Sequence, residues 1–289
     1  MTELRELAHR LLSEGTVNAV LGWEEGPRGA RPAFVTDAAG ADRLVFDPRC
    51  VHNLAAYLSP RRPHLKRLGK VAIVLKPCDA KAVAGLIRET QVPRENVVLI
   101  GVRCGGVLAD PESTEPLSEA TVADRCRGCP DREAKLADLV GTAGPGFPGP
   151  SHRAQKVEEL AALPADQRWA FWQAEFEKCV RCHACRQVCP MCFCERCLAD
   201  KTMPRWIESS PHNRGNFAWH VTRAMHLAGR CVDCGECERV CPEGLPLGLL
   251  TRKVAQVVAD RYDFRPTDDP AVPAPVGTYR MDDPQEFIL

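Results

Sequence analysis

The stretch from Cys179 to Pro242 holds eleven of the sixteen cysteines in this 289-residue chain. Its first part, CVRCHACRQVCP (179–190), and its last part, CVDCGECERVCP (231–242), have the same spacing, C-x2-C-x2-C-x3-C-P. Eight thiols at two identical spacings indicate a segment whose backbone is organised around the metal that the thiolates bind.

This spacing is typical of bacterial two-cluster ferredoxins. The first three thiolates of each motif bind one [4Fe–4S] cluster from a tight loop, and the fourth ligates the other cluster. The proline that follows fixes φ where the chain leaves the loop. We therefore expect two ligand sets: cluster 1 on Cys179, Cys182, Cys185 and Cys241, and cluster 2 on Cys231, Cys234, Cys237 and Cys189.

Structural zinc is the alternative, because zinc sites also use C-x2-C pairs and need four ligands for each ion. Zinc sites rarely have the full C-x2-C-x2-C-x3-C-P spacing, and here it occurs twice. The repeat therefore favours iron and sulfide over zinc.

Composition narrows the class of protein. The length predicts about two domains, and Lys plus Arg equals Asp plus Glu at 38 each, which argues against a nucleic-acid or membrane-surface partner. The first residues, MTELRELAHRLLSEG, lack the apolar core of a signal peptide, and no run of about 18 apolar residues could span a bilayer. So many thiols without such a signal indicate a cytoplasmic protein that is not membrane-spanning.

The first half has an α/β pattern. An amphipathic helix is expected at 3–14, followed by a strand pair in VNAVLGWEEG and RPAFVTD. A β-α-β unit is expected next, with parallel strands and a right-handed crossover. Its strands are VAIVLKP (71–77) and NVVLIGV (96–102), and its helix is CDAKAVAGLIRET between them. DREAKLADLVG (131–141) is expected to be the last helix of this domain.

Each strand of the β-α-β unit ends at a cysteine, Cys78 after the first and Cys104 after the second. The carboxyl ends of parallel strands share one edge of a sheet, so the two thiols should lie near each other. With the C-x2-C pair Cys126 and Cys129 they suffice for a third cluster. The alternative is that the strand-end thiols are small buried apolar groups and that the pair binds zinc or nothing. Cys50, which is isolated, is expected to be inert.

Three more cysteines, Cys192, Cys194 and Cys197, crowd into MCFCERC directly after the first motif. They could hold an additional cluster whose fourth ligand comes from elsewhere, or replace members of the N-terminal set at a domain interface. They could also pack against the clusters as soft apolar groups.

These signals predict an α+β protein: an N-terminal α/β domain with a small, partly parallel sheet, then a helical bacterial-type two-cluster ferredoxin domain and an extended tail. We expect the α/β domain at 1–143, a Gly/Pro linker at 144–154, the dicluster domain with its helical flanks at 155–265 and the tail at 266–289. The tail could wrap a partner subunit. In the first cluster loop, His183 could hydrogen-bond cluster sulfur or be solvated.

The chain resembles the coenzyme F-420 hydrogenase/dehydrogenase beta-subunit-like proteins with a C-terminal 4Fe-4S dicluster domain. The resemblance is carried by KPCDAKAVAGLI, IGVRCGG, RCRGCP and the two cluster motifs. The resemblance covers nearly the whole chain. It implies an electron-transfer subunit beside a heterodisulfide-reductase-like flavoprotein, a hydrogenase, or a formate or aldehyde dehydrogenase. Archetypal members bind FAD and reduce a deazaflavin, but here the ferredoxin module follows the α/β domain, and Gly105 and Gly106 are the only candidates for a cofactor-binding turn.

The main hypothesis is therefore an iron–sulfur electron-transfer subunit of a hetero-oligomeric oxidoreductase complex, which needs no catalytic residue of its own. The alternative is a flavin-containing subunit that reduces a soluble acceptor through its N-terminal domain. A zinc-stabilised scaffold or nucleic-acid-binding protein is a third possibility, disfavoured by the balanced charge.

Overall fold

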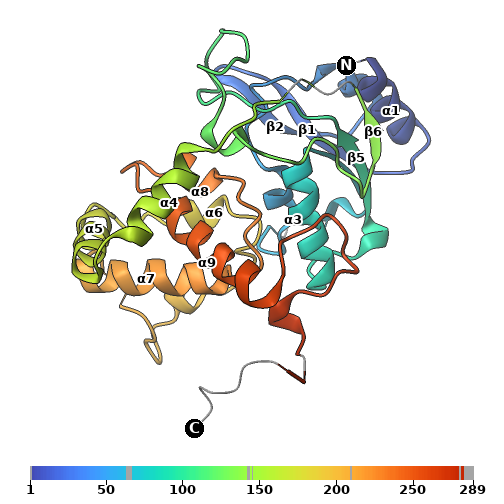
Figure 1. The fold of residues 1–289 in the computed structure, drawn as a ribbon. Helices are drawn as coiled ribbons and strands as arrows, with labels where there is room; N and C mark the ends of the chain where they lie inside the picture. The colour runs from blue at the N-terminus through green and yellow to red at the C-terminus, as the bar shows by residue number, and fades with distance from the viewer. Residues whose placement is uncertain are drawn as a thin grey trace.

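The computed structural model describes residues 2–62, 67–141, 144, 146–208, 210–279 and 281–282. Figure 1 shows a sheet-containing half built from the first part of the chain and a helical half built from the second. The observed elements confirm the predicted α+β class.

The N-terminal half forms one six-stranded sheet in the order β2-β1-β4-β5-β6, and β3 pairs with β1 off this path. β1, β4, β5 and β6 are parallel neighbours, whereas β2 and β3 pair with β1 in antiparallel fashion. The strands are β1 (Ala19–Gly26), β2 (Gly29–Val35), β3 (Leu44–Val45), β4 (Val71–Leu75), β5 (Val97–Val102) and β6 (Asp138–Val140).

The predicted β-α-β unit is present, because α3 (Pro77–Arg88) connects the parallel strands β4 and β5. Every residue of β4 is buried, as expected for a parallel strand covered on both faces. α1 (Thr2–Ser13) precedes the sheet as predicted. Short 3-10 turns complete this half: η1 (Ala38–Arg43), η2 (Leu54–Leu58), η3 (Arg94–Asn96) and η4 (Asp124–Cys126).

The helix predicted at 131–141 was wrong. Residues 138–140 form β6, in which Asp138 pairs with Ile100 and Val140 pairs with Val102. Ala134 is buried in the core beside the sheet, so the apolar residues of this segment serve a strand connection. The open edge of β5 offers backbone groups that need partners, and pairing with them overrides a weak local preference for helix.

The C-terminal half is helical (Figure 1). The long helices α7 and α9 pack against each other, and α4 and α5 pack against α9 and α7 respectively. The single turns α6 and α8 carry Cys185 and Cys237. The helices are α4 (His152–Ala162), α5 (Ala165–Glu177), α6 (Ala184–Gln187), α7 (Asn213–His226), α8 (Glu236–Arg239) and α9 (Leu247–Tyr262), with 3-10 turns η5 (Leu198–Asp200) and η6 (Pro275–Gly277).

The two halves meet through the cysteine-rich stretch. Met191 is buried in the core cluster of the N-terminal half, where it packs over Gly85 of α3. The Arg230 guanidinium also bonds the Glu89 carboxylate at 2.7 Å. The described part of the tail returns to the N-terminal half, since the Asp269 carbonyl accepts a hydrogen bond from Arg88 at 3.0 Å.

Candidate iron–sulfur centres

The two ferredoxin-type loops have the same local backbone conformation. Arg181 and His183 in the first loop, and Asp233 and Gly235 at the equivalent positions of the second, all have φ between 54° and 68°. This left-handed region is unfavourable for residues other than glycine and is tolerated mainly where function requires it. Each loop then ends in a single helical turn, α6 or α8, that carries the third cysteine.

The structure brings together the four cysteines predicted for cluster 1. They line a cavity of about 20 Å³ together with His183, Trp219 and His220. Within this set Cys185 is buried and Cys182 is exposed. The cluster 1 cavity therefore has one side toward the protein interior and one toward solvent.

The four cysteines predicted for cluster 2 line a different cavity, also of about 20 Å³. Burial raises the pKa of Cys231 to about 11 and that of Cys237 to about 12. The thiols of this set are therefore protonated at neutral pH until a metal displaces the protons. Both sets have the composition expected for [4Fe–4S] ligation, although ligation itself stays a prediction.

Each of the two cavities is lined by four cysteines. Among the residues that the structure describes, no three His, Cys, Asp or Glu side chains converge closely enough to share one ion. A [4Fe–4S] cluster instead spreads its four thiolates over four irons, and its ligands surround a cavity. The donor set and its spacing thus fit a cluster in each cavity.

One face of α7 holds the first cluster loop in place. The side-chain amide of Asn216 donates to the carbonyl of Cys179 at 2.9 Å and to that of Phe176 at 2.8 Å. One turn further, His220 Nε2 lies 3.2 Å from the Cys179 Sγ. Arg223 donates to the carbonyl of Cys185 at 3.2 Å. The spacing of four and three residues explains why the three polar side chains share one face.

His220 is the site residue that the sequence reasoning missed, since it selected His183 as the candidate near cluster sulfur. His183 does line the cluster 1 cavity, but its Nδ1 is buried without a hydrogen-bond partner. The signal that could have identified His220 is its spacing of four residues from Asn216 and three from Arg223, which places three polar side chains on one face of the helix. Burial, followed by the charges of Arg223 and Arg181, lowers the pKa of His220 to about 3, so the imidazole is neutral.

Two buried guanidinium groups place positive charge beside the thiols. Arg223 lines the cluster 2 cavity, and Arg181 lines that of cluster 1. Burial by itself lowers the pKa of Arg223, but the neighbouring cysteines, Cys189 first, more than offset it and raise the pKa. The guanidinium thus stays charged and balances thiolate charge that would otherwise be costly to bury.

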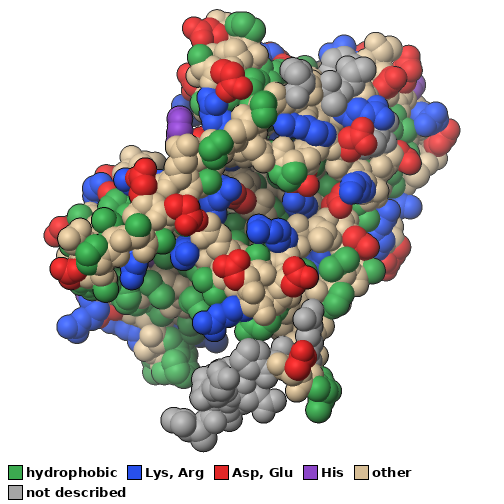
Figure 2. All heavy atoms as spheres, in the orientation of Figure 1, with side chains coloured by type: hydrophobic (Ala, Val, Ile, Leu, Met, Phe, Trp, Pro, Cys, Tyr) green, Lys and Arg blue, Asp and Glu red, His purple; other side chains and the backbone are tan. Residues whose placement is uncertain are grey.

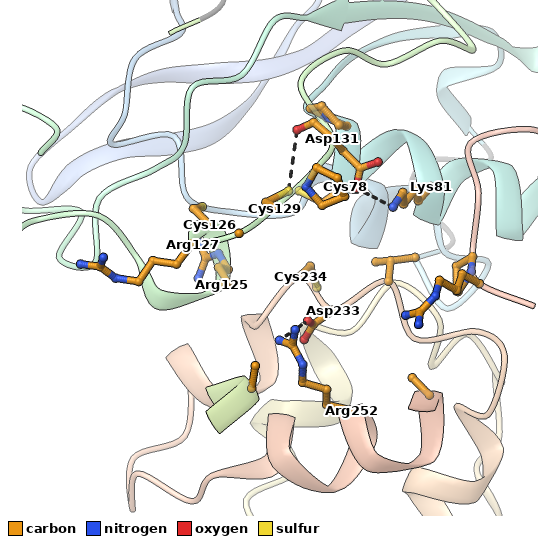
Figure 3. Close-up of a pocket in the computed structure, with 18 of the residues that line it drawn as sticks. Cys78, Lys81, Arg125, Cys126, Arg127, Cys129, Asp131, Asp233, Cys234 and Arg252 are labelled. Carbon is orange, nitrogen blue, oxygen red and sulfur yellow. Dashed lines mark hydrogen bonds and ion pairs between the residues drawn. The ribbon is translucent and has the colours of Figure 1, made fainter. Parts of the chain in front are cut away.

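The four N-terminal cysteines line one larger pocket of about 600 Å³ between the two halves (Figure 3). Cys78 lies in the first turn of α3, directly after β4, and Cys104 lies after β5, as predicted. Figure 3 shows Cys126 and Cys129 on the neighbouring loop and Cys234 of the helical half facing the same space. The structure therefore brings the predicted third set together and adds Cys231 and Cys234 to its surroundings.

Basic side chains surround this pocket. Lys81 bonds Asp131 at 2.5 Å, and Arg252 bonds Asp233 at 2.8 Å (Figure 3). The lining also includes Arg125, Arg127, Arg132 and Arg265. Beneath it the buried Lys76 ammonium lies 3.0 Å from the Asp79 carboxylate and 4.1 Å from the centre of the Trp23 ring. The pocket is thus suited to a group with negative charge.

The three cysteines of MCFCERC line a separate cavity of about 60 Å³. Cys192 also interacts with Cys189, and the hydrogen bond from the Cys189 thiol lowers the pKa of Cys192 to about 7. Cys194 is exposed. The set therefore lies beside cluster 2, apart from the N-terminal pocket.

The residues that line the cavities show in which order the cavities follow one another. Cys231 and Cys234 line both the N-terminal pocket and the cluster 2 cavity. Cys237 of the cluster 2 set belongs to the same packed group as Cys185 of the cluster 1 set. The order is therefore the N-terminal pocket, the cluster 2 cavity, the cluster 1 cavity, and then the surface at Cys182.

Comparison with known proteins supports the metal class. Residues 175–245 match the family model described as a 4Fe-4S dicluster domain. Over 91% of its length the chain is 22% identical to the F420-dependent formate dehydrogenase subunit beta of Methanocaldococcus jannaschii, of which it covers 90%. It is 23% identical to the F420-dependent formate dehydrogenase 1 subunit beta of Methanococcus maripaludis, with the same coverage.

A shorter similarity, 24% identity over 63% of this chain, links it to the acetyl-CoA decarbonylase/synthase complex subunit alpha 1 of Methanosarcina acetivorans. The match covers 23% of that protein. Within the described residues no helix is long and apolar enough to cross a bilayer. The dicluster domain and these relatives confirm the predicted class, and the chain is an iron–sulfur electron-transfer protein.

Proposed function

We propose that this chain is the electron-wiring subunit of a cytoplasmic oxidoreductase complex of the formate dehydrogenase type. In this proposal it holds [4Fe–4S] clusters on the two ferredoxin sets and on Cys78, Cys104, Cys126 and Cys129. The single observation that carries it is the succession of cysteine-lined cavities from the N-terminal pocket to Cys182, in which the first two share Cys231 and Cys234 and the last two are linked by the packing of Cys185 and Cys237. When bound, the clusters supply one-electron transfer.

The chain's own residues separate and insulate the centres. Cys234 lies between the N-terminal pocket and the cluster 2 cavity, and the cluster 2 cavity, at about 20 Å³, is too small to admit bulk solvent. The buried Arg181 and Arg223 offset thiolate charge without providing a proton donor at neutral pH. This arrangement favours electron passage without coupled chemistry, and no residue needs a catalytic role.

The exposed end of the series is the natural exit. Val180 is 53% exposed beside Cys182, and the aromatic pair of Trp169 and Phe217, with ring centres 5.0 Å apart, is also partly exposed in this half. Figure 2 shows acidic and basic side chains interspersed over the visible face. Mixed charge with exposed apolar groups favours a permanent subunit contact over electrostatically steered encounters. The partner is accordingly a redox subunit in a hetero-oligomer.

In this proposal each segment of the chain has its own role. Residues 1–143 form the domain around the N-terminal centre, 144–154 connect it, 155–265 carry clusters 1 and 2, and 266–289 form the tail. Ser151 caps α4, so the helical flank already begins at His152. The set Cys192, Cys194 and Cys197 is a side branch next to cluster 2, where a further cluster would need a ligand from outside this set.

One observation favours a second candidate, a flavin-containing subunit that reduces a soluble acceptor. The N-terminal pocket, about 600 Å³, is far larger than the two cluster cavities and is lined by basic side chains. The relatives named F420-dependent are consistent with such an acceptor. Of the two candidate glycines, Gly106 lines the pocket, whereas a Cβ on Gly105 would lie 2.7 Å from the Cα of Gly144. Gly105 is therefore needed for chain packing rather than for phosphate.

Cysteine variants test the third centre. Anaerobically purified Cys126→Ala should lose about four irons and four sulfides per chain and keep the signals of clusters 1 and 2. Cys50→Ala is the matched control, because Cys50 lines none of the cysteine cavities described above and should leave the iron content unchanged. Unchanged iron in Cys126→Ala would refute a cluster at this site, and stoichiometric flavin would favour the second candidate.

A further inference from the structure

His220 is the α7 side chain that contacts the sulfur of Cys179, a predicted ligand of cluster 1. Asn216 and Arg223, its neighbours on the same helical face, bond the backbone carbonyls of the loop. His220 Nε2 instead lies 3.2 Å from the Sγ of Cys179, which is within hydrogen-bond distance for sulfur. Two of these three contacts therefore hold the backbone of the loop, and the third reaches the Cys179 sulfur.

The direction of this hydrogen bond follows from the ligand chemistry. A cysteine that ligates iron is a thiolate and has no proton to donate. The imidazole must therefore donate from Nε2, as a neutral ring protonated on that nitrogen. Its orientation is fixed, since His220 is 3% exposed and stacks on Phe176 with ring centres 5.0 Å apart and planes 11° apart.

We propose that His220 is a positioning residue that raises the reduction potential of cluster 1 through its hydrogen bond to Cys179. Reduction adds one electron, and with it one negative charge, to the cluster and its thiolates. A donor on a ligand sulfur stabilises that added charge, so the reduced form is favoured. No proton is transferred in this step. The inference rests on the proposed function, because it requires cluster 1 on Cys179.

The first cysteine of the second motif meets a hydroxyl instead of an imidazole. None of the described residues that line the cluster 2 cavity is a histidine. Its first cysteine, Cys231, instead interacts with the hydroxyl of Thr251 on α9, and that hydroxyl also has the carbonyls of Leu247 and Gly248 as acceptors. The hydrogen bond from His220 therefore acts on cluster 1 and has no histidine counterpart among the described residues that line the cluster 2 cavity.

The test is an anaerobic redox titration of the full chain followed by electron paramagnetic resonance, with iron content measured on the same samples. The cluster 1 signal is the one that Cys182→Ala alters. His220→Phe retains a ring over Phe176 but removes the N–H, and we expect the reduction equilibrium to fall about tenfold, or about 59 mV for one electron. His220→Gln, which can again donate an N–H, should recover part of the loss.

His9→Phe is the matched control, because His9 is an exposed histidine on α1 that lines none of the cysteine cavities, and its replacement should leave the potential unchanged. An unchanged potential in His220→Phe with full iron content would overturn the inference, and so would an equal fall in His220→Gln, which would indicate a packing effect. If His220→Phe loses iron, the Fe–S vibrations of wild-type protein and of His220→Gln are compared in H2O and in D2O. A deuterium shift in both proteins supports the hydrogen bond. No deuterium shift in the wild-type protein refutes it. Wild-type protein without cluster 1 iron would instead refute the proposed function itself.

Discussion

At the scale of single residues, burial separates the free cysteine from the predicted ligands. Cys50 is fully buried in the core of the N-terminal half, where it accepts a hydrogen bond from the Asp47 N–H at 3.4 Å. The other cysteines all line one of the four cavities described above. The expectation of an inert Cys50 agrees with this location, because burial disfavours the thiolate by more than the nearby charges of Lys76 and Arg49 favour it.

This burial predicts a pH dependence of stability. Burial raises the pKa of Cys50 to about 12, so the folded chain keeps its proton while the unfolded chain loses it above about pH 9. The stabilisation of the fold by the protonated Cys50 thiol is complete below the pKa that Cys50 has in the unfolded chain. It is lost as the pH rises toward the pKa that Cys50 has in the folded chain. We expect Cys50 to contribute a fall of up to about 1.4 kcal/mol in unfolding free energy per pH unit in this range.

Urea unfolding at pH 8, 9 and 10 checks this value when wild-type protein is compared with Cys50→Ala. The variant should lose a constant amount from the small cavity and should have the shallower pH slope. Parallel slopes for the two proteins would contradict the prediction.

At the scale of elements, α7 acts as the support of the first cluster loop. Its buried polar face contacts the segment from Phe176 to Cys185 at several points, and Arg181 returns a hydrogen bond to the Gly215 carbonyl at 2.6 Å. These bonds compensate backbone groups that the irregular loop leaves without helical or sheet partners. The loop geometry therefore depends on the helix as well as on the metal.

Removing the amide of Asn216 should show this dependence. Asn216→Leu leaves the carbonyls of Phe176 and Cys179 without this donor, and we expect a loss of about 1–3 kcal/mol in unfolding free energy. Asn213→Leu on the same helix is the control, because Asn213 is exposed, and its change should stay within about 0.5 kcal/mol. Denaturation of both variants under anaerobic conditions measures the difference. Equal losses would argue against a specific role for the buried amide.

Local sequence signals identified most elements but not all of their roles. The apolar runs at 71–77 and 96–102 predicted the parallel strands, and the cysteine spacings predicted which thiols meet across some fifty residues. Residues 131–141 were wrongly assigned to a helix. The pairing that makes part of them a strand depends on β5, which is distant in sequence, and so leaves no local signal. The contact of His220 with Cys179 was missed for the same reason: helical spacing locates a face, and only tertiary packing decides what that face meets.

At the scale of the whole molecule, the two halves share one core region. Met191 follows the first ferredoxin motif directly, yet it is 5% exposed within the N-terminal core cluster. Cys231 of the second motif also packs against that cluster. The ferredoxin-type half is therefore attached to the sheet at its cysteine loops, and the cluster 2 cavity adjoins the N-terminal pocket.

This attachment predicts coupled unfolding. Met191→Ala should lower the stability of the N-terminal core by about 2–5 kcal/mol, although the residue belongs to the cysteine-rich stretch. Met225→Ala, at a methionine that is 60% exposed, should change stability by about 0.5 kcal/mol or less. Tryptophan fluorescence of the buried Trp23 with urea would follow the transition, provided the other tryptophans are replaced by Phe in both proteins. A Met191→Ala transition that matches the control would indicate independent halves.

The anaerobic content of iron, acid-labile sulfide, zinc and flavin per chain directly tests the proposed row of three iron–sulfur centres. The proposal predicts at least about twelve irons with matching sulfide, and neither zinc nor stoichiometric flavin. About eight irons would remove the N-terminal centre and reduce the protein to a ferredoxin with an attached α/β domain. A colourless protein that contains zinc would contradict the account as a whole.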